Sequence, residues 1–332
     1  MRRSIWTGLV VLALAAAGLA QEKITLKQQY PPGTYVMTMK QDIASTTAMG
    51  NNTMTSKINM LMAMELTAEK PDANGQMLHM VFKRIAFHSE APSMSTSFDS
   101  EKEDSAQGSP MAPFFGAMVG ATIDVTMDPN GKVAAVTGTD KIWDKLSKDD
   151  PAMAMVAGRM KEQFGEKMFK EMFSQSGNML PAKPVAVGET WTNNIKQELP
   201  VLGKVTLKQD CKLKDIQKTP AGKIAVIEFT GKMTKDEAGP TTKEEGATPT
   251  PTVTKLDMAL AGTMKLDVDT GLMTSAEMTQ KGDMDMSMSM SGPQGDAMTI
   301  PINQNNKMVI ETVPGKYKPA AAPTTKPAEK DL

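Results

Sequence analysis

Apolar and polar residues alternate over several long stretches of the chain. In the stretch KVTLKQDCKL, residues 204–213, Val205, Leu207, Cys211 and Leu213 fall on one side, and lysines dominate the other. A period of two is typical of a β-strand with one buried face. The same period predicts three further strand faces: Tyr35, Met37, Met39 and Ile43; Ile58, Met60, Met62, Met64 and Leu66; Ile123, Val125 and Met127.

The longest alternating run ends in GDMDMSMSMSG, residues 282–292. Its methionines are Met284, Met286, Met288 and Met290, and apolar residues at even positions continue back to Leu272. Because apolar residues recur at even positions throughout this run, the sequence predicts one continuous strand with one apolar face. Nineteen residues at ~3.4 Å each would extend ~63 Å, more than a typical strand, so a bend or bulge is expected at residues 281–283.

Two stretches of the chain match each other. Leu66–Phe82 and Leu213–Phe229 share a leucine, a glycine nine residues later (Gly75, Gly222) and a phenylalanine seven residues after that. Each match is followed by a polar stretch without periodicity, residues 89–110 and 234–252, and then by a glycine-led hairpin pattern. We therefore expect two β-meander repeats of about five strands, at roughly residues 25–137 and 185–312.

The period changes between the repeats. Thr139 is a candidate helix cap before Ile142 and Leu146, and Pro151 is expected to begin a second helix. Helical spacing continues through Phe164, Met168, Phe169, Met172 and Phe173. Helices with one apolar stripe should lie on a sheet face. The sequence therefore predicts an α+β, β-dominated fold: two repeated antiparallel β-meanders forming curved sheets, with an amphipathic helical segment between them.

The N-terminus has the pattern of a secretory signal peptide. Arg2 and Arg3 precede an apolar run from Ile5 to Ala17, and Gly18 and Ala20 fit a cleavage site before Gln21. We expect export to the periplasm or the extracellular space, and no later segment is apolar enough to span a membrane. The expected division is a signal peptide at 1–20, a first meander at 21–137, a helical segment at 138–180, a second meander at 181–314 and a disordered tail at 315–332.

Composition narrows the function. Without Arg2 and Arg3, 35 of the 37 basic residues remain against 38 acidic ones, so no electrostatic affinity for nucleic acid is expected. Cys211 is the single cysteine, which excludes an intramolecular disulfide, and we expect it to be buried. The chain has 31 methionines against 15 aromatic residues, spread from Met37 to Met308, which favours methionine as general core material.

Motifs of catalysis are missing from the sequence. It contains no HExxH, GxSxG or CxxC pattern and no phosphate-binding loop, and its two histidines, His79 and His88, lie at positions of opposite parity on one expected strand. The acidic run Asp99–Ser105 lacks the glycine of a calcium loop and is expected to be solvated. We therefore expect a protein that is not an enzyme and has no cofactor.

The stretch Leu180–Trp191, LPAKPVAVGETW, follows the expected helices and has the spacing P-x-x-x-V-x-x-G-[DE]-[ST]-W. With this motif and its β-rich halves, the chain resembles an uncharacterised, domain-of-unknown-function family of secreted bacterial proteins. The resemblance covers about residues 30–315 and implies bacterial export and a β-rich fold. It implies no activity and no functional residues, and the methionine enrichment departs from the family pattern.

Three roles remain open for an exported, non-enzymatic protein. Methionine is flexible and polarizable, so a methionine-lined cavity could bind a lipid or another apolar ligand. A structural or protein-interaction role in the cell envelope is the second hypothesis. The third is a Cu(I) site, because thioethers select Cu(I) and the row Met284, Met286, Met288 and Met290 places them on one face.

Overall fold

A computed structural model describes residues 22–50, 52–92, 94–102, 109, 111–148, 154, 157–158, 161, 165–199, 202–220, 222–236, 252–289 and 297–319. The expected signal peptide at 1–20, the start of the second helix at Pro151 and most of the expected tail lie outside these residues. What the sequence predicts for these three segments therefore stays a prediction.

The described chain is dominated by long antiparallel strands. The strands are β1 (Gly33–Met49), β2 (Asn52–Ala68), β3 (Gln76–Ala91), β4 (Met94–Asp99), β5 (Thr122–Met127), β6 (Val133–Thr137), β7 (Thr190–Leu199), β8 (Gly203–Thr219), β9 (Gly222–Lys235), β10 (Thr252–Asp267), β11 (Met273–Ser289) and β12 (Ala297–Pro314). The helices are α1 (Ala112–Met118), α2 (Asp140–Ser147) and α4 (Glu166–Asn178).

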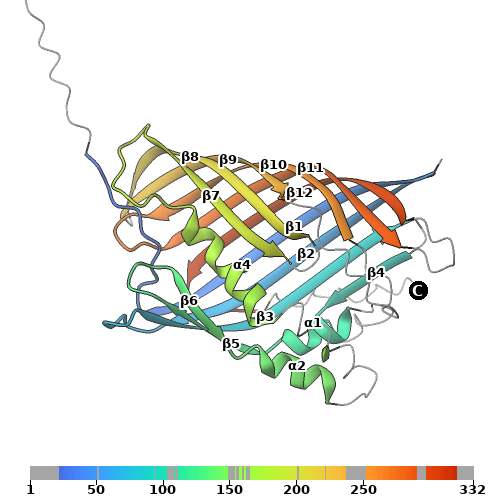
Figure 1. The fold of residues 1–332 in the computed structure, drawn as a ribbon. Coiled ribbons are helices and arrows are strands. Elements are labelled where there is room, and N and C mark those ends of the chain that lie inside the picture. The colour runs from blue at the N-terminus through green and yellow to red at the C-terminus, as the bar shows by residue number, and fades with distance from the viewer. Residues whose placement is uncertain are drawn as a thin grey trace, which may run out of the picture.

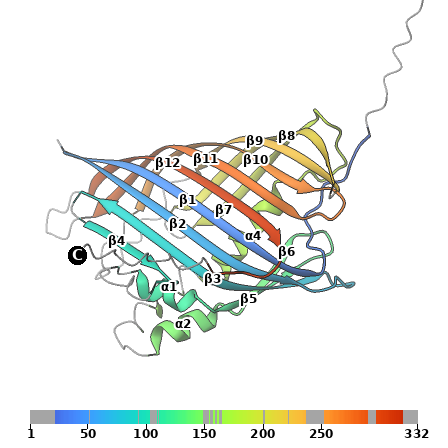
Figure 2. The same ribbon diagram turned by 180° about the vertical axis from the view of Figure 1, so that it is seen from behind.

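All of these strands belong to one sheet. Its order is β6-β5-β3-β2-β1-β12-β11-β10-β9-β8-β7. β4 lies off this path and pairs with residues 86–91 of β3. The sheet curves into a trough, and α4 lies over its open side, in contact with both edge strands, β6 and β7 (Figure 1). Seen from behind, β1 and β12 run along the back of the trough, and α1 and α2 lie below β3 (Figure 2).

The two halves of the sheet have the same strand order. The first half runs β6-β5-β3-β2-β1 and the second runs β11-β10-β9-β8-β7, with β12 inserted where the halves meet. The matching stretches form the β2–β3 and β8–β9 hairpins, and Gly75 and Gly222 have positive φ angles of 125° and 138°. The prediction of a β-dominated fold with two repeated meanders is confirmed; the exact division of the chain stays a prediction.

The alternating faces are buried as the sequence predicts. Met62, Met64 and Leu66 on β2 and Ile123 and Val125 on β5 belong to the core. In the helical segment Ile142 and Leu146 are buried, and Thr139 precedes α2 without a side-chain cap hydrogen bond. One core cluster fills the first half and α1, α2 and α4, and a second fills the second half.

One part of the expected organisation is wrong. The stretch 89–110 was expected to lack periodic structure, but residues 94–99 form β4, which pairs with β3. Thr96 and Phe98 are buried on one side of β4. Because β4 is so short, alternation places only two residues on its buried side. Two such residues among serines and threonines are too few to reveal a strand in the sequence.

The predicted position of the irregularity in β11, at residues 281–283, is also wrong. β11 continues through residues 281–283 with no register shift, as a strand of 17 residues. The shift lies instead at Thr274, because Lys265 pairs with Ser275 and Leu266 with Met273. The extra residue turns Met273 inward, so the single phase expected from Leu272 to Met290 breaks at its start. A strand this long is accommodated because its neighbours are of similar length, 16 residues in β10 and 18 in β12.

Candidate ligand-binding cavity

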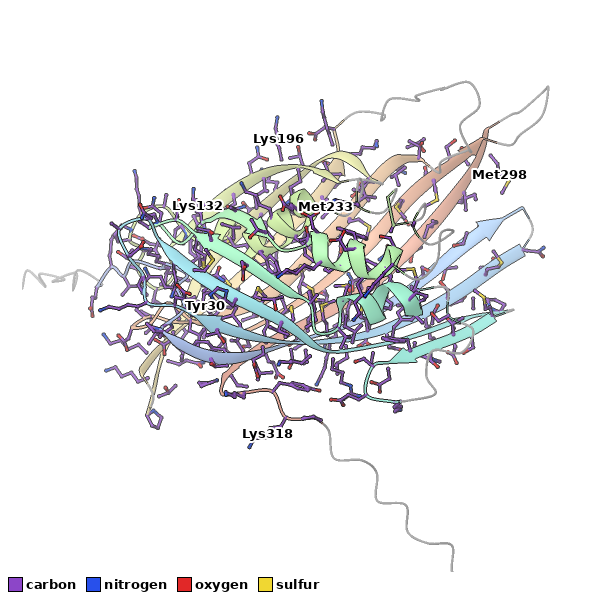
Figure 3. The ribbon with its side chains drawn as sticks, turned by 90° about the horizontal axis from the view of Figure 1, so that it is seen from below. Tyr30, Lys132, Lys196, Met233, Met298 and Lys318 are labelled. Carbon is purple, nitrogen blue, oxygen red and sulfur yellow. The ribbon has the colours of Figure 1, made fainter. Side chains whose placement is uncertain are left out.

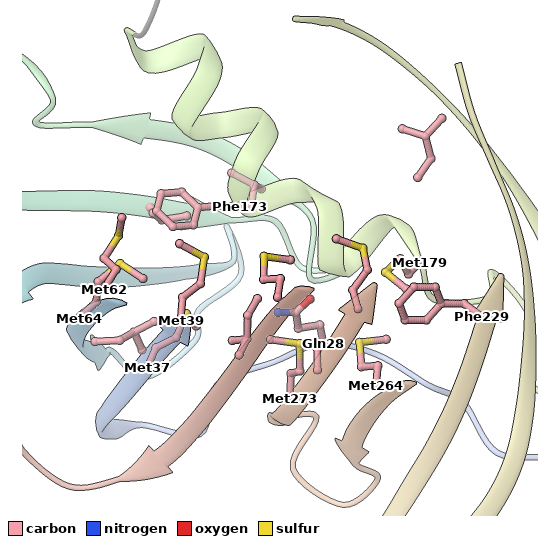
Figure 4. A pocket seen from close by; sticks show the side chains of 18 of the residues that line it. Gln28, Met37, Met39, Met62, Met64, Phe173, Met179, Phe229, Met264 and Met273 are labelled. Carbon is pink, nitrogen blue, oxygen red and sulfur yellow. The ribbon is translucent and has the colours of Figure 1, made fainter. Parts of the chain in front are cut away.

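The trough holds a cavity of about 220 Å³ beside α4, seen from close by in Figure 4. The residues that line it come from the inner faces of both halves of the sheet, from α4 and from the N-terminal segment. They are Gln28, Tyr30, Met37, Met39, Met62, Met64, Leu66, Leu78, Met80, Val125, Met127, Val133, Phe173, Met179, Ile195, Gln197, Leu207, Gln209, Phe229, Met233, Leu260, Met264, Met273, Ala276, Met278, Gln280, Met308 and Ile310.

Methionine dominates this lining because inward positions of neighbouring strands meet in register. Met37 pairs with Met64 and Met39 with Met62 across β1 and β2. The thioethers of these residues lie on one side of the cavity, and Met264 and Met273 lie on the other (Figure 4). Phe173 reaches the cavity from α4, and Met179 from the residue directly after this helix. Tyr30 and Met233, labelled in Figure 3, also belong to this lining.

Polar groups in the lining are few and uncharged. Among the described residues, the lining includes no carboxylate, ammonium, guanidinium, imidazole or thiol. Its polar side chains are Gln28, Tyr30, Gln197, Gln209 and Gln280. The Gln28 amide donates to the Tyr30 hydroxyl at 3.1 Å, and burial raises the pKa of Tyr30 above its usual value. Such a lining suits an uncharged ligand, because an unpaired charge is costly in an apolar cavity.

The segment Ile24–Tyr30, here called the strap, forms part of the wall. Ile24 pairs with Val185, and the Gln29 N–H donates to the Gly271 carbonyl at 2.8 Å. The Lys27 ammonium donates to the carbonyl of Pro129. The strap thus contacts the β5–β6 hairpin of one repeat and the β10–β11 hairpin of the other, and it brings Gln28 and Tyr30 to the cavity.

Helix α4 is anchored to the second half of the sheet through the chain that follows it. The Met179 carbonyl accepts hydrogen bonds from the Trp191 indole at 2.8 Å and from the Asn193 amide at 2.9 Å. Trp191 belongs to the motif LPAKPVAVGETW, so this motif fixes the end of the helix against β7. Phe169, expected on the apolar stripe, is buried, and Phe173 reaches the cavity.

The methionine row that suggested copper lies elsewhere in the trough. Met284 packs against the buried cluster of Val205, Val253, Leu256 and Met258. Met286 follows on the same face of β11, while the side chain of Met288 and all of Met290 lie outside the described residues. The described residues contain no cluster of three or more histidine, cysteine or acidic side chains that could hold a metal ion.

The two histidines were expected on opposite faces of one strand, and this is wrong. A bulge at Lys83 shifts the register of β3, so Phe82 and Ile85, three residues apart, are both buried in the core. His79 and His88 therefore both lie on the outer face. His79 contacts Glu69 at 2.8 Å and Asp124 at 2.7 Å, and these hydrogen bonds raise its pKa.

The acidic run at Asp99 is not simply solvated. The Arg84 guanidinium donates to both oxygens of Asp99, at 3.1 and 2.9 Å, and contacts Glu101 at 3.2 Å. Tyr317 donates to Glu101 at 2.6 Å, and burial together with this carboxylate raises the pKa of Tyr317 to about 12. These contacts tie the C-terminal segment to β4, so the expectation is wrong for Asp99 and Glu101.

Cys211 is buried as expected, with 1% of its surface exposed. Burial raises the pKa of its thiol to about 11, and the Asn193 amide lies 3.7 Å from its sulfur. An inert structural thiol is therefore consistent with its surroundings. Gln209 was not predicted from the sequence as a site residue, although it lies at an inward position of β8 and interrupts the run of apolar residues there.

A family model matches residues 73–273, which is more than half of the chain, and its description is "Family of unknown function (DUF6263)". The chain belongs to this family. The expected resemblance to an uncharacterised family is thereby confirmed, and the family's function is not known. No curated protein matches the sequence. In the described part of the chain, no helix is long and apolar enough to cross a membrane.

Several solved structures match the chain at very low sequence identity and with TM-scores below 0.5. Lipovitellin, described in a structure of its lipid–protein interactions, has a TM-score of 0.44 at 10% identity; the match covers 89% of this chain but 27% of lipovitellin. DynF from Micromonospora chersina has a TM-score of 0.20 at 8% identity, with 91% and 88% covered. The translocator domain of autotransporter NalP from Neisseria meningitidis has a TM-score of 0.21 at 10% identity, with 85% and 89% covered. At these TM-scores, none of them defines the function of this chain.

Proposed function

We propose that this protein is an exported, non-enzymatic binding protein that holds an apolar molecule, such as the acyl chain of a lipid, in the cavity beside α4. The observation that carries the proposal is the lining itself. Twelve of its residues are methionines, and its described polar groups are amides and one phenol. Apolar ligands gain free energy by leaving water for such a surface, at roughly 25 cal/mol per Å² buried.

The size of the cavity supports the proposal. A dry apolar cavity of about 150 Å³ is large enough to bind benzene. The cavity here measures about 220 Å³ and is therefore larger than an aromatic ring requires. Methionine side chains have several rotatable bonds, so the lining can also adapt to a flexible chain.

The chemistry of the lining and the position of His79 support a binding role over catalysis, and the N-terminal sequence supports export from the cell. The described lining supplies no group that could act as a nucleophile or as a general base near neutral pH. His79, which has a raised pKa, lies on the outer face between two carboxylates. The basic and apolar pattern of residues 1–20 supports secretion.

The proposal is tested with a fluorescent apolar molecule, N-phenyl-1-naphthylamine, titrated into the purified protein. Ala276 lines the cavity on β11, and its replacement by Phe adds a benzyl-sized group to the interior. Because a cavity of about 150 Å³ is enough to hold a benzene-sized ring, the added ring takes up a large part of the about 220 Å³ available. Affinity should fall at least tenfold in Ala276→Phe.

The matched control is Thr279→Phe, which adds the same ring to the exposed outer face of the same strand and should leave affinity unchanged. Equal loss in both variants, or no binding by the wild type, would reject the cavity as the site. Native mass spectrometry of the secreted protein gives an independent result. A stoichiometric lipid supports the proposal, whereas one tightly bound copper ion and no lipid would contradict it.

A further inference from the structure

The amide groups of the second half of the sheet lie on one row. Gln280 on β11 pairs with Asn306 on β12 and with Leu260 on β10. Leu260 pairs with Gly231 on β9, and Gly231 with Gln209 on β8. Gln280 and Gln209 therefore belong to the cavity wall at the same level, three strands apart, which is at most ~14 Å between their backbones.

Four side-chain amides of the sheet and the strap have partners within the protein. The Asn306 amide lies 3.5 Å from the Gln280 oxygen, and Gln41 donates to the Asn306 oxygen at 3.3 Å. Gln28 is bonded to Tyr30. These groups are satisfied, so they stabilise the wall and do not require a ligand.

Gln209 differs from them. Its side chain lines the cavity, the residue is 3% exposed, and within the described part of the chain its Oε1 atom has no hydrogen-bond partner. Gly231 on the neighbouring strand leaves room for this side chain: a Cβ at Gly231 would lie 3.1 Å from Gln209 Cγ and 2.8 Å from Leu260 Cδ1. A buried acceptor left unpaired is costly, so it marks a position where a bound molecule can supply the missing donor.

We propose that Gln209 accepts a hydrogen bond from the ligand, and that the ligand is an uncharged amphiphile with a hydroxyl or amide group beside its apolar chain. This inference rests on the proposed function, because it names the polar end of the molecule held by the same cavity. The chemistry follows from the surroundings. An amide oxygen accepts from O–H or N–H, and the described lining offers no cation to an ionised headgroup.

The test compares three molecules with the same twelve-carbon chain as competitors of N-phenyl-1-naphthylamine at pH 8. They are 1-dodecanol, which donates a hydrogen bond, dodecyl methyl ether, which does not, and dodecanoate, which is ionised. One hydrogen bond corresponds to about two- to tenfold in affinity. Dodecanol should therefore bind about two- to tenfold more tightly than the ether, and dodecanoate more weakly than dodecanol.

The variant Gln209→Met removes the acceptor at similar volume and should bring the alcohol-to-ether ratio close to one. The control Gln217→Met makes the same change at an exposed position of β8 and should keep the wild-type ratio. Gln209→Leu serves as a second variant, with folding of each variant checked by circular dichroism. The wild-type comparison needs no variant at all.

Two outcomes overturn the inference while the proposed function stands: equal binding of alcohol and ether by the wild type, or an unchanged ratio in folded Gln209→Met. Tightest binding of dodecanoate would also overturn it, because the site would then recognise a charge. Failure of the proposed function looks different, since none of the three molecules would then displace the fluorophore.

Discussion

The strap can be tested through four glycines that share a backbone conformation but differ in what lies beside them. Gly131 and Gly271, in the equivalent hairpins, have φ angles of 80° and 77°. A Cβ at Gly131 would lie 2.3 Å from the Gln28 carbonyl oxygen, and one at Gly271 would lie 2.6 Å from the Lys27 carbonyl oxygen. Substitution by alanine would therefore push the strap away from the hairpins.

The controls are Gly120 and Gly188, whose φ angles are 79° and 88°. A Cβ at either position would meet nothing within 4 Å. All four Gly→Ala variants incur the same conformational penalty, about 1–2 kcal/mol for a left-handed L-residue. Part of this penalty is offset, by about 0.4–1 kcal/mol, because alanine restricts the unfolded chain. The controls should therefore lose about 0.5–1 kcal/mol of unfolding free energy.

The strap variants should lose more. Overpacking against a backbone that must move typically costs a further 1–3 kcal/mol. We expect Gly131→Ala and Gly271→Ala to lose about 1.5–4 kcal/mol in total, measured by urea unfolding followed by circular dichroism. They should also weaken binding of the apolar fluorophore, since Gln28 and Tyr30 belong to both the strap and the cavity wall. Equal losses in all four variants would refute the close contact between strap and hairpins.

Three further predictions concern single side chains. Met284→Leu should change stability by less than about 1.5 kcal/mol, whereas Met284→Ser should cost roughly 2–5 kcal/mol in urea unfolding, because Met284 packs against a buried cluster; equal effects would place this side chain in solvent. Cys211, with its pKa raised to about 11, should react with a thiol reagent at pH 8 only as fast as the chain unfolds, and rapid labelling of the folded protein would contradict its burial. The pKa of His79 is raised above 6.5 by Glu69 and Asp124, so its contribution to stability should be present below about pH 6.5 and be lost as the pH rises through the folded-state value. Because these side chains are partly exposed, solvent screening limits this contribution to below ~1 kcal/mol. The variant His79→Gln should therefore be slightly less stable than the wild type at pH 5.5 and equally stable at pH 8.5. The opposite pH dependence would refute the ion pairs of His79 with Glu69 and Asp124.

Alternation along the sequence was sufficient to identify most of the sheet's buried face. Positions such as Met62, Met64 and Leu66 follow the local geometry of a strand, whose side chains point to opposite sides in turn. The alternation failed where one inserted residue reverses the phase, at Lys83 in β3 and at Thr274 in β11. Such a bulge is a shift in the register between two paired strands. The pattern of apolar residues within one strand therefore cannot locate it.

The duplication was also evident from the sequence, because Gly75 and Gly222 occupy turns that require the same positive φ angle. The family was indicated by a short motif whose Trp191 secures the end of α4. These features depend on residues close together along the chain. Local sequence is therefore enough to identify them.

Only the tertiary structure placed β12 between the two repeats, where it pairs with β1 and β11. It also placed the strap between the equivalent hairpins and put Gln209 at the same level of the sheet as Gln280. These arrangements join residues that are far apart along the chain, and they depend on how strongly the whole sheet curves. The sequence by itself determined that the interior would be rich in methionine; the curvature of the sheet and the position of α4 decided that this interior contains a cavity.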